Sequence, residues 1–293
     1  TINHIFDSMI IWLASYPKSG NTLVRSMISA YFFSKDGIYN FDLIKNIKQF
    51  PKIGLFQKIG INIKDDKEVI KNYVKVQNTF NTKNSLQFLK THSYLFNFEN
   101  KYPFTDLKNS LGVIYIVRDP RNIINSFAKF WNTPQEKIAE IMINDLYMGG
   151  DFASEKIEDR TKVWTGTWSS NFQSWKSFKF QERYLLVKYE DLIANPEKVF
   201  LKILEFIYQL NKKKFYLNKS KLNNVIKTTK FESMQLLEKK IGFNEAKIND
   251  QTGEKIPFFN LGPKNDWKNS LDGKIRFKIE KAFKKEMQEL NYL

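Results

Sequence analysis

Four short apolar runs, each followed by a cluster of polar and charged residues, constrain the fold of this chain more than any other feature. The runs are rich in β-forming residues, and the stretches between them carry apolar residues at helical spacing. Strands that alternate with helices predict a parallel sheet covered by helices on both faces. The predicted strands are Ile10–Ala14, Leu86–Leu89, Val113–Val117 and Tyr184–Val187.

The helical patterns between these strands complete an α/β arrangement. The clearest helix start is Pro196, which suits the first helical position and follows Asn195, a typical cap residue. No repeat or low-complexity linker divides the chain, so we expect a single domain over residues 1–293. The predicted helices are Leu23–Phe33, Ile123–Phe130, Val163–Phe178 and Pro196–Leu210.

The polar clusters stand where ligands bind in parallel sheets, beyond the carboxyl ends of the strands. In chain order the clusters contain the sequences YPKSGNT, KTHS, RDPRN and KYEDL. Because parallel strands point the same way, their carboxyl ends meet at one side of the sheet. We therefore expect the four clusters to form one site.

The first cluster has the composition of an anion-binding loop. A strand that turns through glycine into a helix directs unpaired N–H groups and the positive end of the helix dipole at the loop. Lys18 adds a full charge, Ser19 and Thr22 add hydroxyl donors, and Gly20 permits close approach of a ligand. The alternative is that Asn21 or Thr22 only caps the helix. The loop differs from the nucleoside-triphosphate P-loop, in which lysine follows glycine.

The second and third clusters supply a base and a second anion site. Lys90 and His92 are alternate residues at a strand end and share one face. His92 is the better placed of two histidines to exchange a proton near neutral pH. Arg118 and Ser126 together suit a phosphate bound through two contacts. The alternatives are a structural histidine and an Arg118 that only braces Asp119 or another carboxylate.

The amino-acid composition limits the classes of ligand and partner that the chain can bind. The net charge of +16 comes mostly from lysine scattered among asparagine, isoleucine and phenylalanine, so it favours anionic ligands in general and not a nucleic-acid surface. No run of about 18 apolar residues predicts a membrane span, and the N-terminus does not resemble a signal peptide. The absence of cysteine fits a reducing compartment, and we expect a cytoplasmic protein. No spacing of histidine, cysteine or carboxylates predicts a metal site.

The motifs resemble those of sulfotransferases of the cytosolic type, which use 3'-phosphoadenosine 5'-phosphosulfate (PAPS). YPKSGNTLVR resembles their 5'-phosphosulfate loop, YIVRDPRNIINSF their 3'-phosphate site, and LKTHS the strand end with the catalytic histidine. Three later stretches, YLLVKYEDLIANPEKVFLKILEFI, TTKFESM and FFNLGPKNDWKNSL, are similar to the core strand and helix of the family and to its C-terminal cofactor segments. The resemblance runs from about Ile10 to Lys268.

This resemblance implies a single α/β domain with a P-loop-like phosphosulfate-binding loop. It implies transfer of a sulfuryl group from PAPS, which leaves as adenosine 3',5'-bisphosphate (PAP), to a hydroxyl or amine of a small-molecule or glycan acceptor without a metal. His92 would be the general base, Lys18 would stabilise the bridging oxygen, and Lys90 would lie close to the transferring group. The implied donor-binding residues are Lys18, Ser19, Gly20, Asn21, Thr22, Arg118, Ser126, Tyr189, Thr229, Phe231, Phe259 and Gly262.

Three segments and two alternative functions complete the predictions. Residues 35–84 and 131–160 are expected to form an acceptor-side cap, and residues 239–257 either a mobile lid or an ordinary surface loop. One alternative function is a nucleotide-dependent kinase, which would need magnesium. The other is a nucleotide-binding protein with weak catalysis, which Leu23 and Asn260-Leu261 permit because they replace the usual tryptophan and Arg-Lys pair. The oligomeric state stays open.

Overall fold

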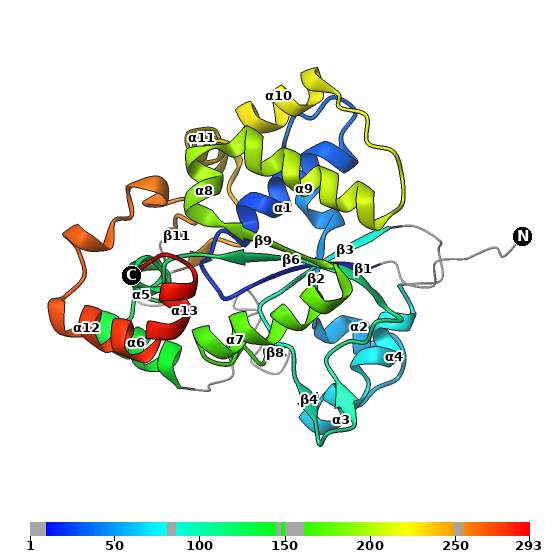
Figure 1. Cartoon of the computed structure of the whole chain (residues 1–293), viewed down its shortest axis with the longest axis horizontal. Helices are drawn as coiled ribbons and strands as arrows, with labels where there is room; N and C mark the ends of the chain where they lie inside the picture. The colour runs from blue at the N-terminus through cyan, green and yellow to red at the C-terminus, as the bar shows by residue number, and fades with distance from the viewer. Residues whose placement is uncertain (1–9, 81–85, 145–147, 150–160, 249–252, 254) are drawn as a thin grey trace, which may run out of the picture.

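A five-stranded parallel sheet lies at the centre of the molecule (Figure 1). The computed structural model describes residues 10–80, 86–144, 148–149, 161–248, 253 and 255–293. The sheet has the strand order β2-β3-β1-β6-β9, and each neighbouring pair is parallel. Its strands are β2 (Lys48–Gln49), β3 (Gln87–Thr91), β1 (Ile10–Ser15), β6 (Ser110–Val117) and β9 (Tyr184–Lys188).

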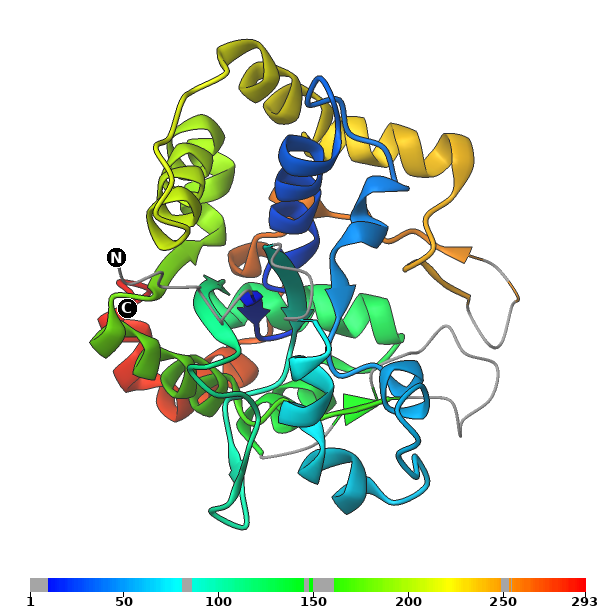
Figure 2. The same cartoon turned by 90° about the vertical axis from the view of Figure 1, so that its right-hand side faces the viewer.

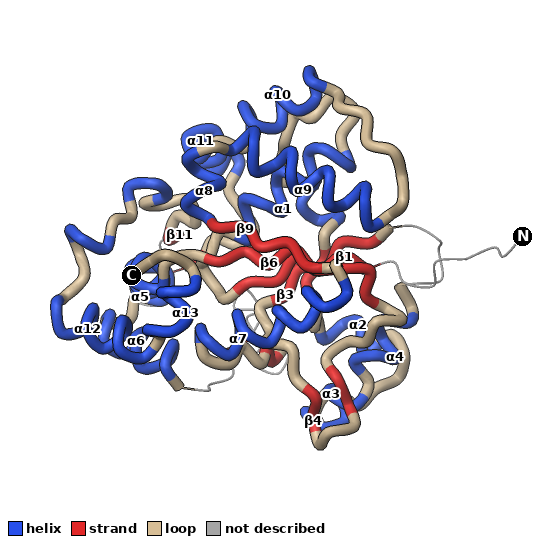
Figure 3. Tube along the Cα trace, viewed as in Figure 1, coloured by secondary structure: helices blue, strands red, loops and turns tan. Residues whose placement is uncertain are grey.

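Alternating side chains of β1 feed two separate cores, one on each face of the sheet. Trp12 and Ala14 belong to one cluster of buried residues, whereas Ile11 and Leu13 belong to the other. Figures 2 and 3 show the sheet between the two layers of helices. One layer contains α1 (Asn21–Phe33), α8 (Tyr189–Ala194), α9 (Pro196–Leu210), α10 (Lys219–Thr228) and α11 (Phe231–Ile241).

The second layer covers the opposite face and contributes the larger aromatic core. Trp12 contacts the rings of Phe50, Phe104 and Trp175, with ring centroids 5.3 to 6.1 Å apart. This layer contains α2 (Ile53–Gln57), α3 (Asp66–Lys71), α4 (Tyr73–Asn78), α5 (Pro120–Trp131), α6 (Gln135–Ile143), α7 (Trp168–Trp175), α12 (Gly273–Ala282) and α13 (Lys284–Glu289). Short antiparallel hairpins pair β4 (Asn97–Phe98) with β5 (Tyr102–Pro103), β7 (Met148–Gly149) with β8 (Lys162–Val163), and β10 (Lys247–Ile248) with β11 (Lys255–Ile256).

The predicted α/β fold with a central parallel sheet is confirmed, and so are the four predicted strands. Helix α9 begins at Pro196 and ends at Leu210 as expected, although the Asn195 side chain makes no capping hydrogen bond. Among the described residues, no helix combines the length and hydropathy needed to cross a membrane.

The helix predicted over Val163–Phe178 is wrong in its first part. Val163 belongs to strand β8, and Gly166 has a φ of +65°, which breaks any helix there. Helix α7 begins only at Trp168, after Thr167, whose hydroxyl accepts a hydrogen bond from the N–H of Ser170 at 2.9 Å.

Candidate active site

The loop between β1 and α1 is shaped by two residues in left-handed backbone conformations. Lys18 has a φ of +65° and Gly20 a φ of +96°. A Cβ atom at Gly20 would lie 2.4 Å from the Tyr189 ring, so this position requires glycine for space as well as for φ. No side chain caps α1, because the cap position is Gly20 and Asn21 is already the first residue of the helix. The Asn21 amide donates to the carbonyl of Leu13 at 2.9 Å. The cap-only alternative is therefore not what the structure shows.

Several polar atoms around this loop are buried without a partner. Among the described residues, Ser19 Oγ, Asn21 Oδ1 and Arg118 Nε have no hydrogen bond within the protein. Buried polar atoms are almost always hydrogen-bonded, so such a group points to a ligand. Two of these atoms, Ser19 Oγ and Arg118 Nε, are donors, and the adjoining loop carries Lys18. The site therefore fits an anion.

Lys18 lies between two aromatic rings. Its Nζ atom is 3.9 Å from the ring centroid of Phe130 and 4.6 Å from that of Phe258. Burial lowers the pKa of Lys18 to about 7, and the charges of Arg118 and Lys90 act in the same direction. Ring faces attract a cation, and a bound anion would favour its charged form. The Lys18 ammonium is thus held where an anion stabilises its charge.

Arg118 joins the anion loop to α8. Its Nη1 atom donates to the carbonyl of Lys18 at 3.2 Å, and its guanidinium lies over the Tyr189 ring, 4.2 Å from the centroid. Asp119 does not pair with Arg118, because it binds Arg121 at 2.7 Å. In the part of the chain that the structure describes, Arg118 forms no ion pair. The brace expected as an alternative is therefore made by the neighbouring arginine.

Arg121 ties this region to the C-terminal helices. Its guanidinium binds Asp119, Glu280 at 2.7 Å and the carbonyl of Tyr292 at 2.8 Å. The Tyr292 hydroxyl donates to Glu190 at 2.8 Å, and the other oxygen of Glu190 accepts from the N–H of Asp119 at 3.0 Å. These contacts fix the backbone that carries Arg118.

His92 follows the last residues of β3 and is held in one orientation. Its Nδ1 atom lies 2.9 Å from the carbonyl oxygen of Ser15. The Ser15 hydroxyl lies 3.2 Å from the same atom. The carbonyl only accepts, so this closer contact favours a proton on Nδ1 and a lone pair on Nε2. Burial lowers the pKa of His92 well below its usual value, and the nearby Lys90 charge adds to this effect. His92 is therefore neutral near pH 7 and able to accept a proton at Nε2.

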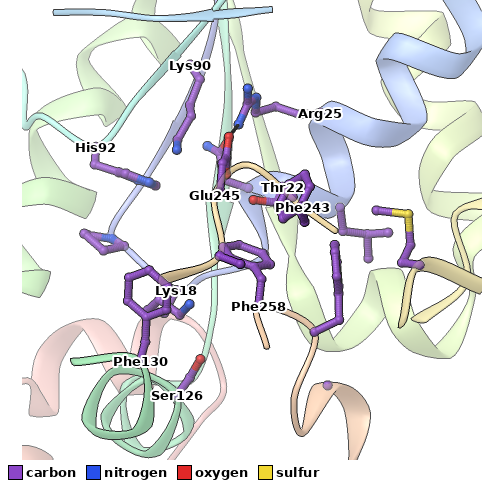
Figure 4. A pocket seen from close by; sticks show the side chains of 18 of the residues that line it. Lys18, Thr22, Arg25, Lys90, His92, Ser126, Phe130, Phe243, Glu245 and Phe258 are labelled. Atoms are coloured by element: carbon purple, nitrogen blue, oxygen red, sulfur yellow. Dashed lines mark hydrogen bonds and ion pairs between the residues drawn. The ribbon is translucent and has the colours of Figure 1, made fainter. Parts of the chain in front are cut away.

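The predicted site residues meet in one cavity of about 1580 Å³. Figure 4 shows Lys18, Lys90 and His92 pointing into the same space, with Ser126 on α5 close to Lys18. Of the fourteen predicted residues, only Ser19 does not line this cavity, since it is buried behind the loop. The others are Lys18, Gly20, Asn21, Thr22, Lys90, His92, Arg118, Ser126, Tyr189, Thr229, Phe231, Phe259 and Gly262.

The far end of the cavity is closed by two of these residues. Gly262 has a φ of +51°, and a Cβ atom there would lie 2.3 Å from the Phe231 ring. The Thr229 hydroxyl donates to the carbonyl of Val225 at 2.7 Å, so it is engaged within its own helix. Phe231 and Gly262 are therefore in direct contact, and this position has no room for a side chain.

An ion pair inside the cavity was not predicted. Arg25 on α1 binds Glu245 at 2.7 Å and the carbonyl of Ile47 at 3.1 Å (Figure 4). Burial would raise the pKa of Glu245, but the charges of Arg25 and Lys90 outweigh it and lower that pKa to about 2. Because 220 residues separate the two partners, no local spacing could reveal the pair. Glu245 belongs to the predicted lid, of which residues 249–252 and 254 lie outside the described residues.

The predicted cap contributes to the cavity only in part. Its lining residues include Lys45, Lys58 and Trp131, whereas Phe50 is fully buried in the core. Residues 81–84, 145–147 and 150–160 of the two cap segments lie outside the described residues.

The family is decided by comparison with known proteins. A family model described as the sulfotransferase domain matches residues 9–291. The chain belongs to the sulfotransferase domain family. The recognition made from the sequence motifs is thereby confirmed.

Curated relatives of this sulfotransferase domain are distant. Human sulfotransferase 1E1 is 24% identical over 287 residues, which cover 97% of this chain and 84% of the relative. Sulfotransferase 2A1 of Macaca fascicularis is 24% identical over 202 residues, which cover 64% of this chain and only 61% of the relative.

Solved structures share the fold. Mouse sulfotransferase SULT7A1 complexed with PAP has a TM-score of 0.58 and 20% identity, with 97% of this chain and 88% of that chain covered. Retinol dehydratase in complex with androsterone and PAP has a TM-score of 0.56 and 14% identity, with 95% of this chain and 80% of that chain covered. At these identities the likeness shows the fold of this sulfotransferase domain alone.

Proposed function

We propose that this sulfotransferase domain transfers a sulfuryl group from PAPS to an acceptor hydroxyl or amine, with His92 as the general base and without a metal. The observation that carries the proposal is the convergence of a neutral, oriented histidine with Lys18, Lys90 and Arg118 in one cavity. The solved relatives complexed with PAP support the choice of donor.

The donor would be held by both anion sites. The Thr22 hydroxyl and the α1 N-terminus, which line the cavity, suit the 5'-phosphate, while Arg118 and Ser126 suit the 3'-phosphate. The aromatic rings of Phe231, Tyr189 and Phe259, which line the cavity, suit the adenine ring.

In the transfer step the acceptor oxygen or nitrogen forms a bond to sulfur while the bond from sulfur to the bridging phosphate oxygen breaks. His92 Nε2 takes the proton that the acceptor loses. The Lys18 ammonium stabilises the negative charge that develops on the leaving bridging oxygen, and Lys90 stabilises the transferring group. Positioning and charge stabilisation of this kind carry most of the catalysis in related phosphoryl transfer.

The test is transfer of label from donor carrying radioactive sulfate to pooled alcohols, phenols, amines and glycans, in excess chelator. We expect a labelled product that chelator does not diminish and that the His92→Ala variant forms far more slowly. Activity that disappears with chelator and returns with magnesium would contradict the metal-free reaction and favour the kinase alternative. Tight binding of PAP without any product would favour the binding protein. A cytoplasmic location and a small-molecule or glycan acceptor belong to the same proposal.

A further inference from the structure

Four exposed lysines from one stretch of the chain line the cavity. Lys45, Lys48, Lys52 and Lys58 all line the cavity, and we refer to these four residues as the lysine wall. They come from a stretch, residues 43–64, that contains no aspartate or glutamate. The wall therefore brings several positive charges to the cavity with no acidic residue interspersed.

The lysine content of the whole chain does not explain this wall. The chain has 47 lysines and arginines against 31 aspartates and glutamates. Among the residues that the structure describes, 11 lysines and arginines line the cavity against 2 acidic residues, Glu232 and Glu245. A general bias would give both sets a similar balance, so the cationic character is concentrated at the cavity.

Within the described residues, one of the four lysines of the wall has an ion-pair partner. Lys45 binds Asp42 at 2.6 Å. Lys48, Lys52 and Lys58 take part in no ion pair with the residues that the structure describes. Glu245 cannot serve them, because its carboxylate is already paired with Arg25 at 2.7 Å.

The lysine wall adjoins the strand that carries the reacting groups. Strand β2 pairs with β3, with Gln49 opposite Lys90, and the N–H of Phe50 donates to the carbonyl of Lys90 at 2.8 Å. His92 stands two residues beyond Lys90. An acceptor whose hydroxyl reaches His92 therefore lies in the same cavity as the lysine wall.

We propose that the acceptor is itself an anion: a hydroxyl-bearing molecule whose carboxylate, sulfate or phosphate groups lie against the lysine wall. This rests on the proposed function, because the negative charges of the donor are already assigned to Lys18, Arg118 and the α1 N-terminus. Exposed lysines each contribute little, so the acceptor needs several charges to gain affinity. An acidic saccharide combines such charges with many hydroxyls.

The experiment is calorimetric binding to the PAP-saturated protein, so that the donor site is occupied. Three matched probe pairs are compared: tetragalacturonate with its methyl ester, sucrose octasulfate with sucrose, and inositol hexaphosphate with inositol. We expect at least one anionic probe to bind roughly tenfold or more tightly than its neutral partner, the gain that several lysine contacts together provide. In a separate assay with donor that carries radioactive sulfate, an anionic probe that binds and has free hydroxyls should receive the label.

A triple variant, K48Q/K52Q/K58Q, tests whether the anionic probe binds at the lysine wall. It should lose roughly tenfold or more of the affinity for the anionic probe and leave PAP affinity within twofold. The matched control is K198Q/K202Q/K213Q, which removes three exposed lysines that do not line the cavity. The control should bind the probe like the wild type.

Two results would overturn the proposal. One is that no anionic probe binds better than its neutral partner. The other is that the wall variant and the control lose the same affinity, which would mean a general effect of net charge. Failure of PAP itself to bind is a separate outcome, which would instead overturn the proposed donor.

Discussion

The two sides of the cavity are built in different ways. The donor side is buried: it places Ser19, Asn21 and Arg118 at the carboxyl ends of strands and leaves polar atoms of these residues unpaired. The lysine wall is exposed and carries charges on flexible stems. A buried, oriented group can match one ligand closely, whereas exposed lysines attract a class of ligands. We infer that the donor is recognised by geometry and the acceptor largely by charge.

The largest effect is expected at His92, which stands between the two sides. The His92→Ala variant should lower kcat by about two to four orders of magnitude, because it removes the general base. Binding of PAP should be unchanged, since His92 holds no part of the donor. Steady-state kinetics and calorimetry measure the two effects. Turnover within a few-fold of the wild type would remove His92 from the mechanism.

Lys18 should act mainly on the rate, although it belongs to the donor side. The bridging oxygen gains charge only as the reaction proceeds, so Lys18 stabilises the transition state more than the bound donor. The Lys18→Met variant should lose roughly a hundredfold in kcat, as removal of one preorganised donor does. A wild-type kcat in this variant would show that the loop does not contact the reacting group.

Arg118 should act on binding and not on the rate. The charge of the 3'-phosphate does not change in the reaction, so its partner contributes equally to the ground and transition states. The Arg118→Met variant should raise the KM for the donor by about 30- to 150-fold, which corresponds to about 2–3 kcal/mol of charged hydrogen bonding.

A control separates this effect from a general loss of charge. Lys198→Met removes an exposed cation of α9 that does not line the cavity, and its KM for the donor should stay at the wild-type value. If PAP binds Arg118→Met as tightly as the wild type, the 3'-phosphate lies elsewhere.

The smallest effect is expected from pH. The pKa of Lys18 is about 7 in the free protein, so Lys18 loses its charge as the pH rises above 7. A bound anion favours the charged form, and PAP affinity should therefore fall above pH 7, by up to about tenfold per pH unit. Calorimetry between pH 7 and 9 measures this slope, which should flatten in Lys18→Met. An equal slope in both proteins would assign the titration to another group.

The difference between the two sides also explains what the sequence could predict. Donor residues follow strand ends, and a strand end can be located from an apolar run and the glycine or proline that follows it. Lys18, His92 and Arg118 were found in this way, and the structure brings them into one cavity. Pro196 predicted its helix start for a similar reason, because proline fits only the first turn.

The remaining features depend on contacts between distant residues. Arg25 and Glu245 lie far apart in the chain, and neither has a neighbour that indicates its partner. The lysine wall was hidden by the high lysine content, since only the folded chain shows which lysines border the cavity. The start of α7 at Trp168 had a local signal, because Thr167 can accept a hydrogen bond from the N–H of Ser170 and so cap the helix. Apolar residues at helical spacing on both sides of Thr167 concealed this signal.

The contacts of Arg121 have a practical consequence for the boundaries of an expressed protein. Tyr292 lies in the last turn of the chain, yet its carbonyl and hydroxyl both bind residues that support the Arg118 loop. Shortening the chain before Tyr292 would remove supports of the donor site while leaving the central sheet intact. A well-folded truncated protein could thus be mistaken for an inactive enzyme.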